Sequence, residues 1–190
     1  KRQCPGKSFA ILEAQETFGG TWHTHRYPGV RSDSDLYTFG YSFKPWTEEP
    51  VATGARILAY LEAVIAENDL GRHIRYGHKV ISADWSAAEA LWTLKIRLAD
   101  GSDSTLRANF LWMGQGYYRH EEGYTPDWPG MADYRGRIVH PQKWPADLDY
   151  AGKRIAVIGS GATAATIVPA MAEKAGHITL VQRSPTYFNP

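Results

Sequence analysis

The pattern of apolar and polar positions is most regular between residues 154 and 184. Residues 155–158 form an apolar run that predicts a buried parallel strand. Residues 162–174 then predict a helix, and residues 177–182 predict a second strand. A strand, a glycine turn, a helix and a strand within about 30 residues form the context in which a glycine motif binds a dinucleotide. The pattern therefore predicts an α/β fold.

The central part of the chain carries two further patterns. Residues 53–70 predict an amphipathic helix, with Thr53 as its N-cap and Gly71 after its end. Three alternating runs downstream predict an antiparallel meander of strands, at residues 79–86, 91–98 and 104–112.

Two apolar runs predict strands at the edges of a larger domain. Residues 110–116 predict a buried strand followed by a glycine turn, and residues 8–12 predict a short strand that ends at Glu13. In a dinucleotide fold the second strand ends in such a carboxylate, which accepts from the adenosine ribose hydroxyls. The first strand and its glycine loop lie roughly 20 residues before that acid. Only twelve residues precede Glu13, so we expect this strand and loop to be missing; the alternative is an exposed glutamate at a strand end.

The glycine motif after residue 158 suits a dinucleotide phosphate. Gly159 permits a tight turn, Gly161 lets a pyrophosphate approach the backbone, and Ala164 allows the helix to pack closely on the strand. The N-terminus of the helix offers free N–H groups to the phosphates. The alternative is a turn that only packs the helix. The predicted NADP-binding residues of this motif are Gly159, Ser160, Gly161, Ala162, Thr163, Ala164 and Ala165.

The residue after the second predicted strand distinguishes the two nicotinamide cofactors. An NAD site usually has an acidic residue there, whereas this chain has Arg183 followed by Ser184. A guanidinium and a hydroxyl suit a 2′-phosphate, so the sequence predicts NADPH in preference to NADH.

Composition excludes several classes of protein. The 190 residues have 43% hydrophobic and 22% charged content with a net charge of +1, which gives no case for nucleic acid or an anionic membrane as partner. Cys4 is the single cysteine, so dithiol chemistry and a disulfide framework are excluded and a cytoplasmic location is expected. His23 and His25 are expected on one strand face, but two ligands without a third predict no metal site.

A second motif precedes the glycine turn. Tyr134, Gly136, His140 and the pair Trp144-Pro145 follow one another at a characteristic spacing. This segment resembles the fingerprint of the Baeyer–Villiger monooxygenases, among the class B flavoprotein monooxygenases, with Tyr134 where the pattern usually has Phe. The segments at residues 116–118, 122–126 and 182–187 resemble the actinobacterial branch that activates the thioamide drug ethionamide.

The resemblance implies an enzyme that uses FAD, NADPH and O₂. NADPH reduces the flavin, and O₂ gives a C4a-(hydro)peroxyflavin. One oxygen atom then passes to a ketone, or to a soft sulfur in a thioamide or sulfide. Retained NADP⁺ shields the flavin from water. One alternative is a classical flavin-containing monooxygenase that oxygenates nitrogen or sulfur; the missing CxxC pair argues against a flavin disulfide reductase.

The resemblance also implies site residues. No catalytic residue is expected in this chain: Asp33 would orient a catalytic arginine from beyond residue 190, and His140 would be a linker residue coupled to domain motion. The alternatives are an exposed Arg31–Asp33 ion pair, a surface turn at residues 18–24 and core packing at Val80. The implied FAD-binding residues are Glu13, Gly20, Thr21, Trp22, His23, Thr24, Asp33 and Val80, and the further NADP-binding residues are Arg31, Ser32 and Asp33.

These observations predict two Rossmann-like dinucleotide-binding domains in tandem, both incomplete. Residues 1–130 are expected to be a partial FAD domain with the meander, residues 131–150 a linker with the fingerprint, and residues 151–190 the start of an NADPH domain. An isolated chain of this kind is expected to be inactive, so a dinucleotide-binding fragment without catalysis is the remaining alternative.

Overall fold

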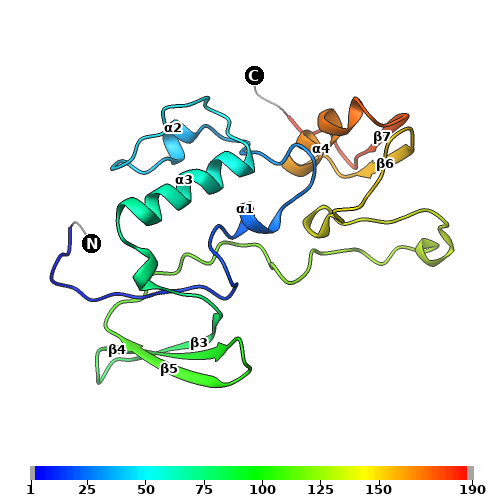
Figure 1. Ribbon diagram of the computed structural model, residues 1–190. Helices are drawn as coiled ribbons and strands as arrows, with labels where there is room; N and C mark the ends of the chain where they lie inside the picture. Colours follow the sequence, from blue (N-terminus) through cyan, green and yellow to red (C-terminus); the bar gives the residue numbers. More distant parts are fainter. Residues whose placement is uncertain (1–2, 188–190) are drawn as a thin grey trace. The chain divides into compact units, whose positions relative to one another are not determined.

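The computed structural model describes residues 3–187, and its backbone divides into two compact units. The first unit combines residues 1–20 with 61–117, and the second combines residues 21–60 with 118–190. Each unit is therefore built from two separate stretches of the chain. Figure 1 shows the course of the backbone.

The first unit contains the antiparallel meander that the sequence predicts. Its strands are β3 (His78–Ser86), β4 (Leu91–Leu98) and β5 (Asp103–Ala108), in the order β3-β4-β5. Leu94 and Ile96 of the central strand β4 are buried. They lie two residues apart, so their side chains share the face of the sheet that is covered. A register shift between Val80 and Ser82 places a bulge in β3.

A short parallel pair adjoins the meander in the same unit. β1 (Ile11–Leu12) pairs with β2 (Ile74–Arg75), which follows a 3₁₀ turn at Gly71–His73. Glu13 continues this pairing through its backbone, because its N–H donates to the carbonyl of Arg75 at 3.0 Å. The strand predicted at residues 8–12 is thus confirmed only in its last two residues.

The third predicted strand is too long. β5 ends at Ala108, and residues 110–116 lie in no strand. Phe110 is 75% exposed and Trp112 83% exposed. The prediction of a buried strand here was wrong, because an apolar run becomes a strand only when another strand pairs with it.

The helix α3 (Gly54–Glu67) confirms the predicted amphipathic helix. The Oγ of Thr53 accepts from the backbone N–H of Arg56 at 3.4 Å, as expected of an N-cap. Ile57 and Val64 are buried on its apolar face. Two short helices precede it, α1 (Thr21–Thr24) and α2 (Leu36–Phe39).

The second unit contains a strand-helix-strand element. β6 (Arg154–Ile158) pairs in parallel with β7 (His177–Val181), and α4 (Ala162–Ala172) connects them. Figure 1 shows α4 beside the two strands. The core of this element comprises the buried residues Tyr27, Ile167 and Met171, with Val30, Trp144, Tyr150, Ile155 and Ile178 packed against them.

The loop before α2 packs directly on α4. Gly29 has a φ of +77°, and a Cβ there would lie 2.6 Å from the carbonyl oxygen of Thr166 and 2.7 Å from the Cβ of Ala170. Only glycine fits this contact. Two 3₁₀ turns, Met131–Asp133 and Pro141–Lys143, complete the described elements of this unit. Within the part of the chain that the structure describes, no helix is long and apolar enough to cross a membrane.

Candidate functional site at the start of helix α4

The turn between β6 and α4 is the centre of the candidate site. Gly159 follows the strand with a φ of +107°, a conformation that other residues rarely adopt. Gly161 precedes the helix in an extended conformation. A Cβ on either glycine would meet no atom within 4 Å. The backbone of the turn therefore faces open space.

The N-terminus of α4 has no side-chain cap. Gly161 makes no capping hydrogen bond, and its carbonyl accepts from the N–H of Ala165 at 3.1 Å. The backbone N–H groups of Ala162, Thr163 and Ala164 precede this bond, so they have no acceptor within the helix. Free N–H groups and the positive end of the helix dipole together favour an anion at this position.

The segment after β7 is hydrogen-bonded to the glycine turn. The Oγ of Ser160 lies 2.7 Å from the Oγ of Thr186 and donates to the carbonyl of Ser184 at 3.4 Å. The structure thus brings together two predicted NADP-binding residues, Ser160 and Ser184. Arg183 immediately precedes this contact, and its side chain is exposed.

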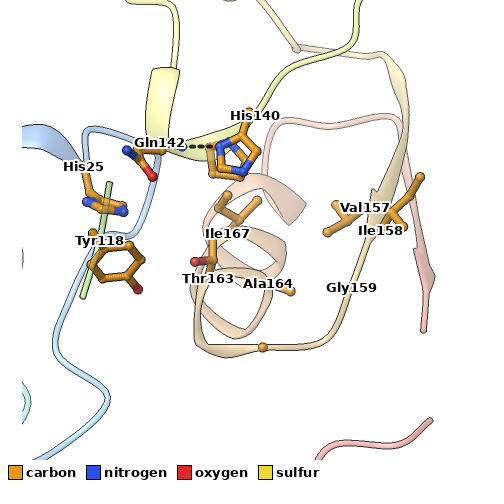
Figure 2. Close-up of a pocket in the computed structure, with 12 residues that line it drawn as sticks. His25, Tyr118, His140, Gln142, Val157, Ile158, Gly159, Thr163, Ala164 and Ile167 are labelled. Carbon is orange, nitrogen blue, oxygen red and sulfur yellow. Dashed lines mark hydrogen bonds between the residues drawn. The ribbon is translucent and has the colours of Figure 1, made fainter. Parts of the chain in front are cut away.

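A cavity of about 230 Å³ lies beside the turn. Figure 2 shows its lining, in which His25, Tyr118 and Gln142 lie near one another and the turn lies across from them. One wall consists of Val157, Ile158, Gly159, Gly161, Thr163, Ala164 and Ile167; the other consists of His25, Tyr118, His140, Pro141 and Gln142.

The second wall is held by hydrogen bonds between segments far apart in sequence. Gln142 is only 6% exposed, and its side-chain N–H donates to the carbonyl of Arg119. The ammonium of Lys143 donates to the carbonyl of His120 at 3.2 Å, and the Nδ1 of His120 lies 3.1 Å from the hydroxyl of Thr24. These bonds fix the fingerprint segment against residues 119–120.

His25 is the buried titratable group of this wall. It is 5% exposed, its Nδ1 lies 3.0 Å from the carbonyl of Thr21, and its ring meets the ring of Tyr118 edge-on at 4.9 Å. Burial lowers the pKa of His25, and the nearby His120 and His140 lower it further, against the opposing effect of the Thr21 hydrogen bond. The imidazole is therefore neutral at pH 7.

The predicted flavin segment begins with two glycines of positive φ, +105° at Gly19 and +47° at Gly20. They lead into α1, so His23 lies on a helix rather than on the strand that the sequence predicts. The Nδ1 of His23 lies 3.2 Å from a guanidinium nitrogen of Arg26. Among the described residues no group of three or more His, Cys, Asp or Glu side chains has the geometry of a metal site.

The segment Arg31-Ser32-Asp33 lies between α1 and α2. Ser32 is buried, and its hydroxyl donates to the carbonyl of Ser34 at 2.6 Å. Arg31 and Asp33 are exposed on either side of it. No ion pair joins these two side chains in the described structure, so both charges are accessible from solvent. The carboxylate of Asp33 accepts from the hydroxyl of Ser34 at 3.2 Å.

Glu13 and Val80 belong to the first unit. The carboxylate of Glu13 accepts from the N–H of Gln15 at 2.8 Å, which leaves further lone pairs of the carboxylate available. Its charge contributes, after burial, to the raised pKa of Tyr76. Val80 is 41% exposed and lies beside the bulge of β3.

Three residues with polar side chains line the cavity but were not predicted as site residues: His25, Tyr118 and Gln142. In the sequence, His25 is a candidate only for a metal ligand, Tyr118 belongs to a segment that resembles the actinobacterial branch, and Gln142 lies within the fingerprint segment. A signal existed at Gly123, because its backbone lies so close to the His140 ring that any Cβ would overlap the ring. A glycine that faces a motif histidine indicates tight packing at that histidine.

Comparison with known proteins defines the class. The model of the L-lysine 6-monooxygenase/L-ornithine 5-monooxygenase family matches residues 59–190, which is more than half of the chain. The chain therefore belongs to this family of monooxygenases.

Particular relatives confirm the resemblance to the class B flavoprotein monooxygenases. The chain is 54% identical over 188 residues to the FAD-containing monooxygenase EthA of Mycobacterium tuberculosis, with 98% of this chain and 38% of that protein covered. It is 49% identical over 189 residues to the probable FAD-binding monooxygenase AlmA of an Acinetobacter species, with the same coverage. The chain thus spans well under half the length of these relatives.

Solved structures agree with this assignment. An oxidized steroid monooxygenase bound to NADP matches with a TM-score of 0.80 and 35% identity, over 97% of this chain and 36% of that one. A cyclohexanone monooxygenase mutant from Rhodococcus sp. Phi1, bound to NADP⁺, matches with a TM-score of 0.82 and 31% identity, over 99% of this chain and 36% of that one.

Proposed function

We propose that this chain is part of an FAD- and NADPH-dependent monooxygenase. The enzyme transfers one atom of O₂ to a small molecule, either a ketone in a Baeyer–Villiger reaction or a soft sulfur in a thioamide or sulfide. The observation that carries the proposal is the open glycine turn at the start of α4, beside a cavity. The names of the relatives, FAD-containing and NADP-bound monooxygenases, support it.

The residues of the turn fit a dinucleotide phosphate. Gly159 and Gly161 present backbone with no side chain in the way, and the free N–H groups that follow are donors for phosphate oxygens. We assign recognition of the 2′-phosphate to Arg183; the hydrogen bond from Ser160 to the carbonyl of Ser184, which holds the adjoining backbone next to the turn, supports this assignment. These residues bind and orient NADPH in the proposed enzyme.

The predicted flavin residues fit FAD in two places. Gly20, the last residue of the first stretch of the first unit, leads directly into α1 of the second unit, where the backbone is open to close approach beside Trp22 and Asp33 is exposed. In the first unit, the Glu13 carboxylate retains lone pairs for ribose hydroxyls, and the backbone next to the β3 bulge at Val80 suits an adenine edge. Bound FAD would supply the chemistry that activates O₂, and NADPH the hydride.

The chain itself supplies binding and orientation. We assign to Asp33 the orientation of a catalytic arginine from outside this chain, and to His140 the linkage of the fingerprint segment. We further propose two Rossmann-like domains in tandem: residues 1–130 in the FAD domain, 131–150 as linker and 151–190 in the NADPH domain. The exposed free thiol of Cys4 suits the cytoplasm, where we place the enzyme.

Substitution of one glycine tests the NADPH site. We expect Gly161→Val, in the protein expressed at the length that its gene encodes, to fold normally because the Cβ position is open. The added side chain would displace the phosphates, and loss of one or two hydrogen bonds to a charged group weakens binding roughly a hundredfold. The measurement is the Kd of NADPH, together with NADPH oxidation against a ketone and a thioamide.

The matched control is Gly114→Val in the segment after β5, where an added Cβ would make only an ordinary contact, 3.9 Å from the ring of Trp112. This variant should bind NADPH like the wild type. A Gly161→Val protein with unchanged affinity would show that the turn is not the NADPH site. Flavin content, read from the visible absorbance, shows separately whether FAD is bound.

A further inference from the structure

Two histidines face the cavity beside the glycine turn. Because of their hydrogen bonds to the backbone, one offers a ligand a hydrogen-bond acceptor and the other a donor. Both His25 and His140 line the cavity, as Figure 2 shows. Each uses its Nδ1 in a bond to the backbone. Because a neutral imidazole has one N–H and one bare nitrogen, the role of Nδ1 determines what Nε2 offers to a ligand.

His25 offers an acceptor. Its Nδ1 lies 3.0 Å from the carbonyl oxygen of Thr21, which can only accept, so Nδ1 carries the proton. Nε2 of the neutral ring is then bare. Burial lowers the pKa of His25, which favours this neutral form. The ring also makes edge contacts with the aromatic rings of Tyr27 and Tyr118, which together with the Thr21 bond restrict the direction of Nε2.

His140 offers a donor. Its Nδ1 accepts from the backbone N–H of Gln142 at 3.2 Å, so the proton of the neutral ring is on Nε2. The ring is packed against the backbone of Gly123, which leaves no room for a side chain there. His140 and the N-terminus of α4 are therefore both donors.

A dinucleotide requires both kinds of group. Phosphate oxygens accept hydrogen bonds, and the donors of the turn and of His140 suit them. Ribose hydroxyls and a carboxamide donate, and they need an acceptor. The residues that line the cavity come from β6, the turn, α4 and the second wall, whereas Arg183 and Ser184 are not among them. With the diphosphate at the turn and the 2′-phosphate at Arg183, the part of the nucleotide that would reach His25 is the part beyond the diphosphate.

We propose that His25 is a further NADPH-binding residue whose Nε2 accepts a hydrogen bond from the nicotinamide riboside half of the cofactor, a ribose hydroxyl or the carboxamide N–H. This inference rests on the proposed function. His140 lies on the same wall, and its Nε2–H would be a donor for the diphosphate.

Two substitutions test the two ring nitrogens of His25 separately: Nδ1, which bonds to the carbonyl of Thr21, and Nε2, the proposed acceptor. His25→Asn keeps an N–H near the position of Nδ1 and removes the acceptor, whereas His25→Gln places an amide oxygen near Nε2. In the flavin-loaded protein at its encoded length, we expect His25→Asn to raise the Kd of NADP⁺ about three- to tenfold, the effect of one hydrogen bond. His25→Gln should retain more of the affinity than His25→Asn. His177→Asn, at the exposed start of β7, is the matched control.

A shorter ligand distinguishes binding from structural damage. 2′,5′-ADP ends before the nicotinamide riboside, so its Kd should be the same in the wild type and in His25→Asn. Equal loss of both ligands would show that His25 only supports the fold, and an unchanged Kd of NADP⁺ would refute the proposal outright. Failure of the wild type to bind either ligand would instead refute the proposed function.

A spectroscopic measurement does not depend on the variants. Nitrogen-15 NMR of the imidazoles should show the proton on Nδ1 of His25 and on Nε2 of His140 at neutral pH. On addition of NADP⁺, the Nε2 signal of His25 should shift as it accepts a hydrogen bond. A proton found on Nε2 of free His25 would refute the assignment.

Discussion

Two segments of this chain have the same sequence pattern and different structures. Residues 155–161 and residues 110–116 are each an apolar run followed by glycines, and both predict a buried strand with a glycine turn. The first forms β6, whose side chains Ile155 and Val157 are partly buried. The second lies in no strand, with Phe110 and Trp112 largely exposed.

The difference lies in what the two segments contact. β6 pairs residue by residue with β7, and the Gly159 N–H extends the pairing to the carbonyl of Val181 at 2.8 Å. Ile155 also packs on the core of Tyr27, Ile167 and Met171. An apolar pattern alone is therefore not sufficient to form a strand, because the partner strand for its backbone hydrogen bonds and the surface that packs on it come from other parts of the chain.

The largest expected effect tests this packing. Gly29→Val should destabilise the protein by about 3–5 kcal/mol, because overpacking and an unfavourable φ add together. The added Cβ would collide with the backbone of Thr166 on α4. The measurement is the free energy of unfolding in urea.

Gly116→Val is the matched control in the exposed segment. Gly116 has a similar φ of +71°, but a Cβ there meets nothing within 4 Å. It should lose only the conformational part of the effect, about 1–2 kcal/mol. Equal losses in the two variants would show that the loop at Gly29 is not packed on α4 in solution.

The same contrast explains how much of the molecule the sequence predicts. The helix α3, the meander and β6–α4–β7 follow from the sequence pattern, because in each of them the hydrogen bonds join residues within one continuous stretch of the chain. The wall of His25, Tyr118 and Gln142 does not follow from any local pattern. It forms through contacts between residues more than 90 positions apart, such as His25 with Tyr118.

An intermediate effect is expected at the end of β7, the strand that pairs with β6; residues 110–116 have no such partner strand. Arg183→Ala should weaken NADPH binding roughly ten- to a hundredfold and leave NADH binding unchanged, because only NADPH has the 2′-phosphate that a guanidinium recognises. The Kd values of both cofactors measure this directly. Equal losses for NADPH and NADH would contradict the assignment of Arg183 to the 2′-phosphate.

The smallest expected effect is a pH dependence of the free energy of unfolding, caused by the buried His25. The pKa of His25 in the folded protein lies below its ordinary value of about 6.5. Between these two values the unfolded chain binds a proton and the folded protein does not, so the free energy of unfolding should fall as the pH falls through about 6.5, by at most about 1.4 kcal/mol per pH unit. Among the described residues, the titratable groups in ring contact or electrostatic interaction with this imidazole include Tyr27, Tyr118, His120 and His140. Urea unfolding at several pH values should therefore give a slope that His25→Asn removes and that His177→Asn, in an exposed position, retains. A slope that survives in His25→Asn would show that burial of His25 does not cause the pH dependence.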